Sequence, residues 1–133
     1  MKKRSELREI IMKVLYQISI FEGTDLDYNV DDLIKEQLEI KNDFVYDSVY
    51  GIINHKKDII KIANKYLKDW TIDRLNKVDS AILMLGIYEL LYTDTPSVVS
   101  INESIELSKM YSEEAVTKMI NGVLDKIYHE EIK

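Results

Sequence analysis

Positively charged side chains are concentrated at the start of the chain. Lys2, Lys3, Arg4 and Arg8 outnumber the two glutamates of the same stretch, whereas the whole chain has a formal net charge of -6. Binding of phosphate groups needs local positive potential, so a nucleic-acid site in this acidic protein must be a patch. The basic start is the clearest patch that the sequence offers. The alternative is an ordinary solvated N-terminus.

An aromatic side chain shares a helical strip with one of these arginines. Arg8, Met12 and Tyr16 recur at a spacing of four residues. The far end of this strip lies nearly opposite the apolar stripe of the helix that we expect from Ser5 to about Phe21. Unpaired RNA bases stack on aromatic rings and guanidinium groups, so the strip has the side-chain types of an RNA contact. Alternatively, Met12 and Tyr16 pack against a second group of helices.

A second polar strip lies near the end of the chain. Lys118, Asn121 and Asp125 align on one face of a helix expected over residues 112–127. The apolar residues on both sides of Asn121 and Gly122 keep the helical period, so we interpret this pair as helical rather than as a hairpin turn. Gly122 should then mark a close contact. The polar strip is a candidate surface for partners, expected beside the basic face of the first helix, or it is merely a solvated face.

The sequence shows no catalytic machinery. The two histidines, His55 and His129, belong to no metal-binding helical motif. The four glycines are scattered, so phosphate-loop and dinucleotide patterns are missing, and no serine occupies a nucleophile elbow. Glu103 and Glu106 could share a ligand, but such pairs are routine on solvated helices. We therefore expect no catalytic residue, no metal site and no cofactor in a chain suited to binding.

The composition favours helices over sheet. With 46% apolar residues, one proline and four glycines, the chain should form an all-α fold in a single domain of residues 1–133. The helix over residues 81–92 is apolar nearly all round and should be the central one. Apolar periodicity predicts the helices to span residues 5–21, 30–38, 42–67, 81–92, 101 onward and 112–127.

Several polar residues occupy positions where helix caps are expected. Asn42 or Asp43 should cap the long helix, and Thr71 should cap a short turn after it. Ser100 and Glu103 have the spacing of a capping box, in which two side chains satisfy the free amides of a helix start. This spacing predicts that a helix begins one residue after Ser100.

The composition also bears on the compartment. The chain has no cysteine, so a disulfide framework is excluded and a reducing compartment is compatible. Its first apolar residues are interrupted by polar ones, unlike a signal peptide, and no apolar run reaches the length that spans a bilayer. We expect a soluble, cytoplasmic protein with no membrane partner.

Several short tracts are distinctive in combination. In chain order they are Val14-Leu15-Tyr16-Gln17 after the basic start, Asp79-Ser80-Ala81-Ile82-Leu83, Ile87-Tyr88-Glu89-Leu90, Pro96 followed by Ile101-Asn102-Glu103, and Asn121-Gly122-Val123-Leu124-Asp125-Lys126. In these tracts, and nearly from end to end, the chain resembles the NusB family of bacterial transcription antitermination factors. The tracts after Pro96 are the most specific.

The resemblance implies both a fold and a function. The fold is all-helical, with about seven helices arranged as two three-helix sub-bundles. Such proteins pair with the small-subunit ribosomal protein NusE and bind boxA RNA of nascent transcripts, notably of ribosomal RNA operons. They act in the antitermination complex of RNA polymerase with other Nus factors. By resemblance, the expected RNA contacts are Lys2, Lys3, Arg4, Arg8 and Tyr16, with Lys118 and Asn121 as weaker candidates.

The chain departs from the family pattern at a few positions. The basic start is diluted by Glu6 and Glu9. Met119 stands where an aromatic residue commonly precedes the Asn-Gly-Val-Leu-Asp-Lys string, and Ala115 occupies a position that is often polar or acidic. Each departure removes a possible contact. We therefore expect weak RNA binding by the isolated chain, strengthened by the NusE partner, because an acidic subunit offers few phosphate contacts.

Two alternatives stay open at this level. The chain could be a helical protein adaptor or a homodimer, with the strip of Arg8, Met12 and Tyr16 buried between subunits. It could instead be a module of the kind that precedes the catalytic part of some ribosomal RNA cytosine methyltransferases. No cofactor-binding α/β segment follows here, so we expect no methyl transfer.

Overall fold

The computed structural model describes residues 2–133, which fold into seven α-helices and two short helical turns. This confirms the predicted all-α fold. Apolar residues at helical spacing give the first helix seven of its eight buried positions, and the eighth is Arg8. The elements are α1 (Arg4–Glu22), α2 (Val30–Gln37), α3 (Asp43–Asn54), α4 (Lys56–Tyr66), η1 (Ile72–Arg74), α5 (Lys77–Tyr92), α6 (Ser97–Tyr111), α7 (Glu114–Ile127) and η2 (Tyr128–Ile132).

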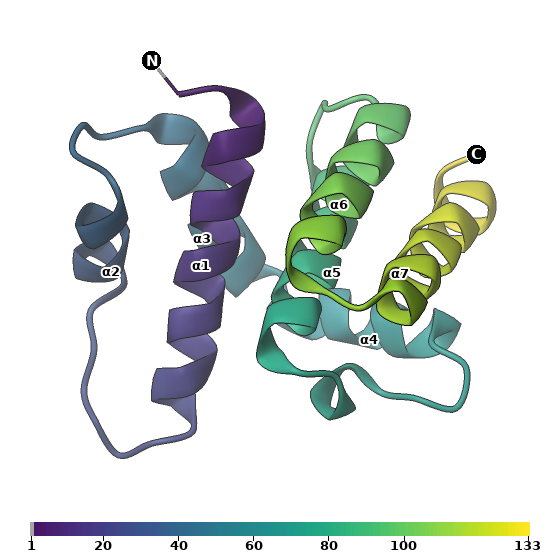
Figure 1. Cartoon of the computed structure of the whole chain (residues 1–133), viewed down its shortest axis with the longest axis horizontal. Helices are drawn as coiled ribbons and strands as arrows, with labels where there is room; N and C mark the ends of the chain where they lie inside the picture. Colours follow the sequence, from purple (N-terminus) through teal and green to yellow (C-terminus); the bar gives the residue numbers. More distant parts are fainter. Residues whose placement is uncertain (1) are drawn as a thin grey trace.

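The helices form two groups that meet at α5. Helices α1, α2 and α3 lie on one side, and α5, α6 and α7 form the other group, with α4 crossing behind it (Figure 1). Helix α5 contacts α1, α3, α4, α6 and α7, and ten of its residues are buried. A helix enclosed on all sides must be apolar nearly all round, as its sequence is, with Glu89 as the main exception. The predictions of two sub-bundles and of a central helix are confirmed.

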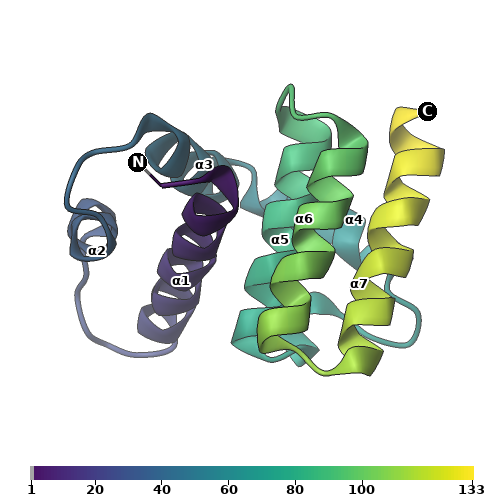
Figure 2. The ribbon, with the colours of Figure 1, turned by 45° about the horizontal axis from the view of Figure 1, so that its top comes forward.

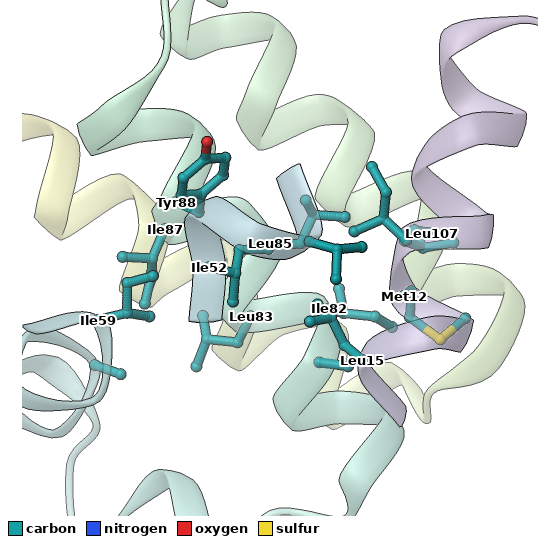
Figure 3. Close-up of a cluster of buried hydrophobic side chains, with 14 of the residues drawn as sticks. Met12, Leu15, Ile52, Ile59, Ile82, Leu83, Leu85, Ile87, Tyr88 and Leu107 are labelled. Atoms are coloured by element: carbon teal, nitrogen blue, oxygen red, sulfur yellow. The ribbon is translucent and has the colours of Figure 1, made fainter. Parts of the chain in front are cut away.

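The core between the two groups includes a residue that we expected on a binding strip. Met12 is only 2% exposed and belongs to the same buried cluster as Leu15, Ile82 and Leu107 (Figure 3). The strip of α1 that runs from Arg8 to Tyr16 therefore faces the second group of helices over its first half. The alternative interpretation, packing against those helices, holds for Met12.

The helix predicted over residues 42–67 is two helices. Asn42 caps α3 as expected, because its side-chain oxygen accepts a hydrogen bond from the Val45 amide at 3.2 Å. The chain leaves the helical path at His55 and α4 begins at the next residue. The His55 ring stacks on Tyr92 of α5, with centroids 3.9 Å apart. Apolar periodicity continues through this break, so the sequence pattern alone did not reveal it.

The predicted start of α6 is also wrong. The helix begins at Ser97, after Pro96 at the cap position, and Ser100 lies inside its first turn. Ser100 and Glu103 are used for contacts between helices instead of capping: the Ser100 hydroxyl donates to Glu89 at 3.4 Å, and Glu103 accepts from Arg8. Proline has no amide hydrogen and does not fit the interior of a helix, so the helix begins directly after Pro96.

Helix α7 begins at Glu114 rather than at Ser112, and the Ser112 hydroxyl instead donates to the buried carboxylate of Asp79 on α5. The Asn121-Gly122 pair is helical, as predicted. Gly122, however, marks no close contact, since a Cβ there would meet nothing within 4 Å in the described part of the chain.

A glycine in close contact with neighbouring helices occurs elsewhere in the second group. A Cβ at Gly86 of α5 would lie 2.6 Å from the Ser104 hydroxyl oxygen of α6 and 3.0 Å from a methyl of Leu124 on α7. Three helices therefore converge at Gly86, where only glycine fits without movement. Among residues 2–133, no helix is both long enough and apolar enough to cross a membrane.

Candidate nucleic-acid interface

The basic start leads into the first turn of α1, where it is exposed. Lys2, Lys3 and Arg4 all have exposed side chains, and the Lys3 amide donates to a carboxylate oxygen of Glu6 at 3.3 Å. The Arg4 guanidinium carbon lies 3.9 Å from the ring centroid of Phe44, at the first turn of α3. The fold thus presents three neighbouring cations to solvent and rests one of them on an aromatic ring.

Arg8 does not belong to this exposed surface. It is only 6% exposed, and its Nε and Nη2 atoms donate to the two carboxylate oxygens of Glu89 at 2.7 and 2.9 Å. Its Nη1 donates to Glu103 at 2.9 Å. We call this group of Arg8, Glu89 and Glu103 the Arg8 cluster. The expectation that Arg8 lies on a face away from the core is wrong, because all three nitrogens of its guanidinium donate to carboxylates within the protein.

The Arg8 cluster joins the two groups of helices. Arg8 comes from α1, while Glu89 and Glu103 come from α5 and α6. Burial by itself lowers the pKa of the guanidinium, but hydrogen bonds and charge from Glu89 and Glu103 outweigh it and raise the pKa above its usual value. The bidentate pairing fixes α1 against α5 in one orientation. Arg8 therefore supports the surface around Arg4 from below.

Tyr16 is exposed, as the RNA hypothesis requires. Its side chain is 38% exposed, one turn beyond the buried Met12. Arg4 and Tyr16 are both on α1, an unbroken helix, and lie about 18 Å apart along its axis at about 1.5 Å per residue. An RNA strand that contacts both must run along the helix rather than cross it.

A tyrosine on α6 borders the same side of α1. The Tyr111 hydroxyl donates to the carboxylate of Glu9, which lies 3.9 Å from the Lys13 amine. This hydrogen bond raises the pKa of Tyr111 to about 12, because the neutral phenol donates to a charged acceptor and ionisation would break the bond. The Tyr111–Glu9 contact ties the end of α6 to α1.

The Tyr111–Glu9 contact predicts an alkaline dependence of stability. A pKa raised in the folded state means that the contribution is complete below the ordinary tyrosine pKa of 10.0 and is lost as the pH rises through about 12. Tyr111→Phe should therefore remove one phenol from the late part of the tyrosinate absorbance titration, followed in the folded protein. If the variant instead loses a phenol that ionises near the ordinary value, the hydrogen bond to Glu9 is not present in solution.

Lys118 and Asn121 are exposed but lie apart from the basic start. Both are on α7, and Lys118 pairs with Glu114 of its own helix at 3.6 Å. Helices α5 and α6 lie between α1 and α7 in both views of the ribbon (Figures 1 and 2). The expectation that this polar strip lies beside the basic face of α1 is wrong. The structure brings Lys2, Lys3 and Arg4 together and leaves the α7 pair as a separate surface.

A groove of about 590 Å³ runs along α7, next to the end of α4 and η1. Its only tryptophan, Trp70, is 48% exposed, and the Arg74 guanidinium lies 5.4 Å from the ring centroid. Apolar side chains of α7, including Val116 and Met119, line one wall. The lysines and arginine along the groove are Lys68, Arg74 and Lys126. Such an apolar groove with polar edges suits contact with another protein.

Comparison with known proteins decides the family. The model of the NusB family matches residues 5–129. The chain belongs to the NusB family. The transcription antitermination protein NusB of Listeria innocua serovar 6a is 41% identical over 130 residues, which cover 97% of this chain and 98% of that protein. The protein of the same name from Methylacidiphilum infernorum is 42% identical over 130 residues, covering 96% and 91% of the two chains.

Solved NusB structures share the fold. NusB of T. maritima superimposes with a TM-score of 0.85 at 30% identity, covering 99% of this chain and 94% of that one. A chain from a crystal structure of the antitermination factors NusB and NusE in complex with dsRNA gives a TM-score of 0.81 at 29% identity, covering 95% and 96%. The NusB-family fold is thus present over nearly the whole chain.

In this NusB-family chain, the sequence did not reveal that three residues contact the arginines of α1. Phe44 lies 40 residues after Arg4 in the sequence, so no local spacing connects the two. Glu89 and Glu103 follow Arg8 by 81 and 95 residues. The one available signal was Glu89, a carboxylate within an otherwise apolar central helix, which requires a buried cationic partner.

Proposed function

We propose that this chain is a transcription antitermination factor that binds boxA RNA of nascent transcripts together with the ribosomal protein NusE. It works in the cytoplasm as one NusB-like domain, within the antitermination complex of RNA polymerase and other Nus factors. It has no enzymatic activity of its own and acts within this complex through binding alone. The observation that carries the proposal is the exposed cluster of Lys2, Lys3 and Arg4 on a NusB-family fold.

The exposed residues of α1 support the RNA part of the proposal. Lysines 2 and 3 supply cations for phosphate groups, while Arg4 and Tyr16 supply flat surfaces on which unpaired bases stack. Arg8 is removed from the list of direct contacts, because its donors are used by Glu89 and Glu103. Lys118 and Asn121 remain proposed as a lesser contact on a separate surface.

The charge of the chain supports a requirement for the partner. With a net charge of -6 and only a few exposed cations at the start of α1, the isolated chain makes few phosphate contacts. A second subunit that adds its own contacts to the same RNA raises the affinity of the assembly. The groove beside Trp70 is the surface that we propose for this protein partner, since interface cores are apolar.

The test is a titration of boxA RNA and of a scrambled RNA of equal length, each with and without NusE. The isolated chain should bind both RNAs weakly. With NusE present, boxA should bind at least about tenfold more tightly than the scrambled RNA, which is the size of about one base-reading contact. The emission of Trp70, half exposed in the free chain, follows binding of NusE in the same samples.

Two outcomes count against the proposed function. Equal affinities for boxA and scrambled RNA in the presence of NusE overturn the assignment of boxA. A stable homodimer in light scattering, which neither RNA nor NusE dissociates, favours the adaptor or homodimer alternative instead. An unchanged Trp70 emission on binding of NusE places the partner elsewhere than in the groove.

A further inference from the structure

The exposed side chain of Arg4 makes a cation–π contact with the half-buried ring of Phe44. Phe44 is partly buried and packs against the hydrophobic core, so its ring has little freedom. The guanidinium of Arg4 lies over this ring at 3.9 Å from its centroid, whereas the Arg4 side chain as a whole is exposed. A guanidinium at this distance from a ring is attracted by the ring quadrupole, and its planar shape favours stacking on the ring face.

The ring itself is held by a second arginine. The guanidinium carbon of Arg8 lies 5.6 Å from the Phe44 centroid, within the range of a cation–π contact. Arg8 is immobilised in turn by Glu89 and Glu103. A chain of contacts thus runs from the buried carboxylates through Arg8 and Phe44 to Arg4 at the surface. The exposed guanidinium of Arg4 thus lies over a ring that packs against the core.

We propose that Phe44 is a positioning residue for RNA: it holds the Arg4 guanidinium flat so that its outer face stacks one unpaired base. The proposal rests on the proposed RNA-binding function and assigns one subsite within it. The base occupies the side of the guanidinium opposite Phe44, and Lys2 and Lys3 hold the adjoining phosphates. Stacking on a guanidinium plane is a recurring mode of recognition for unpaired RNA bases.

A stacking role differs from simple attraction of phosphate in what it requires of the side chain. A phosphate contact needs only positive charge, which lysine also provides. A stacking contact needs the flat guanidinium, which an ammonium group cannot replace. Arg4→Lys therefore separates the two roles at an exposed position where folding is not at risk. Phe44→Leu removes the ring from below, and Phe44→Tyr keeps it.

The experiment is a scan of boxA RNAs that each lack one base, titrated with the chain and NusE at several salt concentrations. For the unmodified chain, removal of one particular base should weaken binding by about five- to tenfold. The Arg4→Lys variant should bind intact boxA RNA more weakly by the same factor. Removal of that one base should then not weaken its binding further. Its salt dependence should not change, because the charge is kept. Phe44→Leu should behave like Arg4→Lys, and Phe44→Tyr like the unmodified chain.

The controls make the failures distinguishable. Thermal unfolding followed by circular dichroism reports whether Phe44→Leu is folded, and Arg4→Lys tests the idea in any case. If Arg4→Lys binds intact boxA as tightly as the unmodified chain and keeps the same response to every missing base, the stacking subsite is refuted while boxA binding stands. If the unmodified chain does not distinguish boxA from scrambled RNA, the proposed function fails and the subsite fails with it.

Discussion

Arg8→Ala is expected to lower the free energy of unfolding by about 3–5 kcal/mol, the usual cost of removing one partner of a buried ion pair. The substitution leaves the carboxylate of Glu89, which is 2% exposed, without its bidentate donor. A buried charge without a partner is far more costly than a lost surface contact. Urea denaturation at neutral pH measures the loss.

A matched control and a second substitution test the cause. Lys109→Ala also removes the cation of an ion pair, but this pair with Glu106 is exposed on both sides, so the change should stay within about 0.5 kcal/mol. Adding Glu89→Gln to Arg8→Ala removes the stranded charge and should recover part of the stability. An Arg8→Ala protein as stable as the Lys109→Ala protein would show that the Arg8 cluster is open to water in solution.

The second large effect is expected at Gly86. Gly86→Ala places a methyl group 2.6 Å from the hydroxyl oxygen of Ser104 and 3.0 Å from Leu124, where α5 meets α6 and α7. Overpacking of this kind costs about 1–3 kcal/mol, and the better helix propensity of alanine offsets about 0.8–1.0 kcal/mol of that cost. The net result is a destabilised protein with the same helix content.

Gly122→Ala is the matched control for Gly86→Ala. The same substitution in a helix of the same group meets open space, so only the propensity gain of about 0.5–1 kcal/mol applies and the protein should become more stable. Chemical denaturation of both variants measures the two signs side by side. Equal effects at the two positions would mean that helix propensity, and not the contact of α5 with α6 and α7, decides the outcome at Gly86.

The fold was largely predictable because its helices are strongly periodic. The bounds of α1 and α2 were expected to within one residue, and the apolar circumference of α5 predicted its central place. Periodicity reports which face of a helix is buried, not where a helix is interrupted. The break at His55 was therefore missed, since the apolar pattern continues on both sides of it.

The binding surface was less predictable, because polar residues have more than one use. Arg8 has the type and position of an RNA contact, but its partners lie on α5 and α6, far away in sequence. Ser100 and Glu103 have the spacing of a helix cap but bond across helices instead. Gly122 and Gly86 look alike in the sequence, and only the second lies at a close contact. Such differences depend on neighbours that local patterns do not contain.

The unbroken course of α1 fixes the spacing of the exposed residues that it carries. Arg4 and Tyr16 lie on this one rigid helix, and the Arg8 cluster anchors the helix between them. One residue inserted between Arg4 and Tyr16 would turn them by about 100° relative to each other and change their separation by about 1.5 Å. The helix thus fixes both the distance and the relative direction of Arg4 and Tyr16. Substitutions on this surface keep that geometry, whereas an insertion or deletion between the two residues changes it.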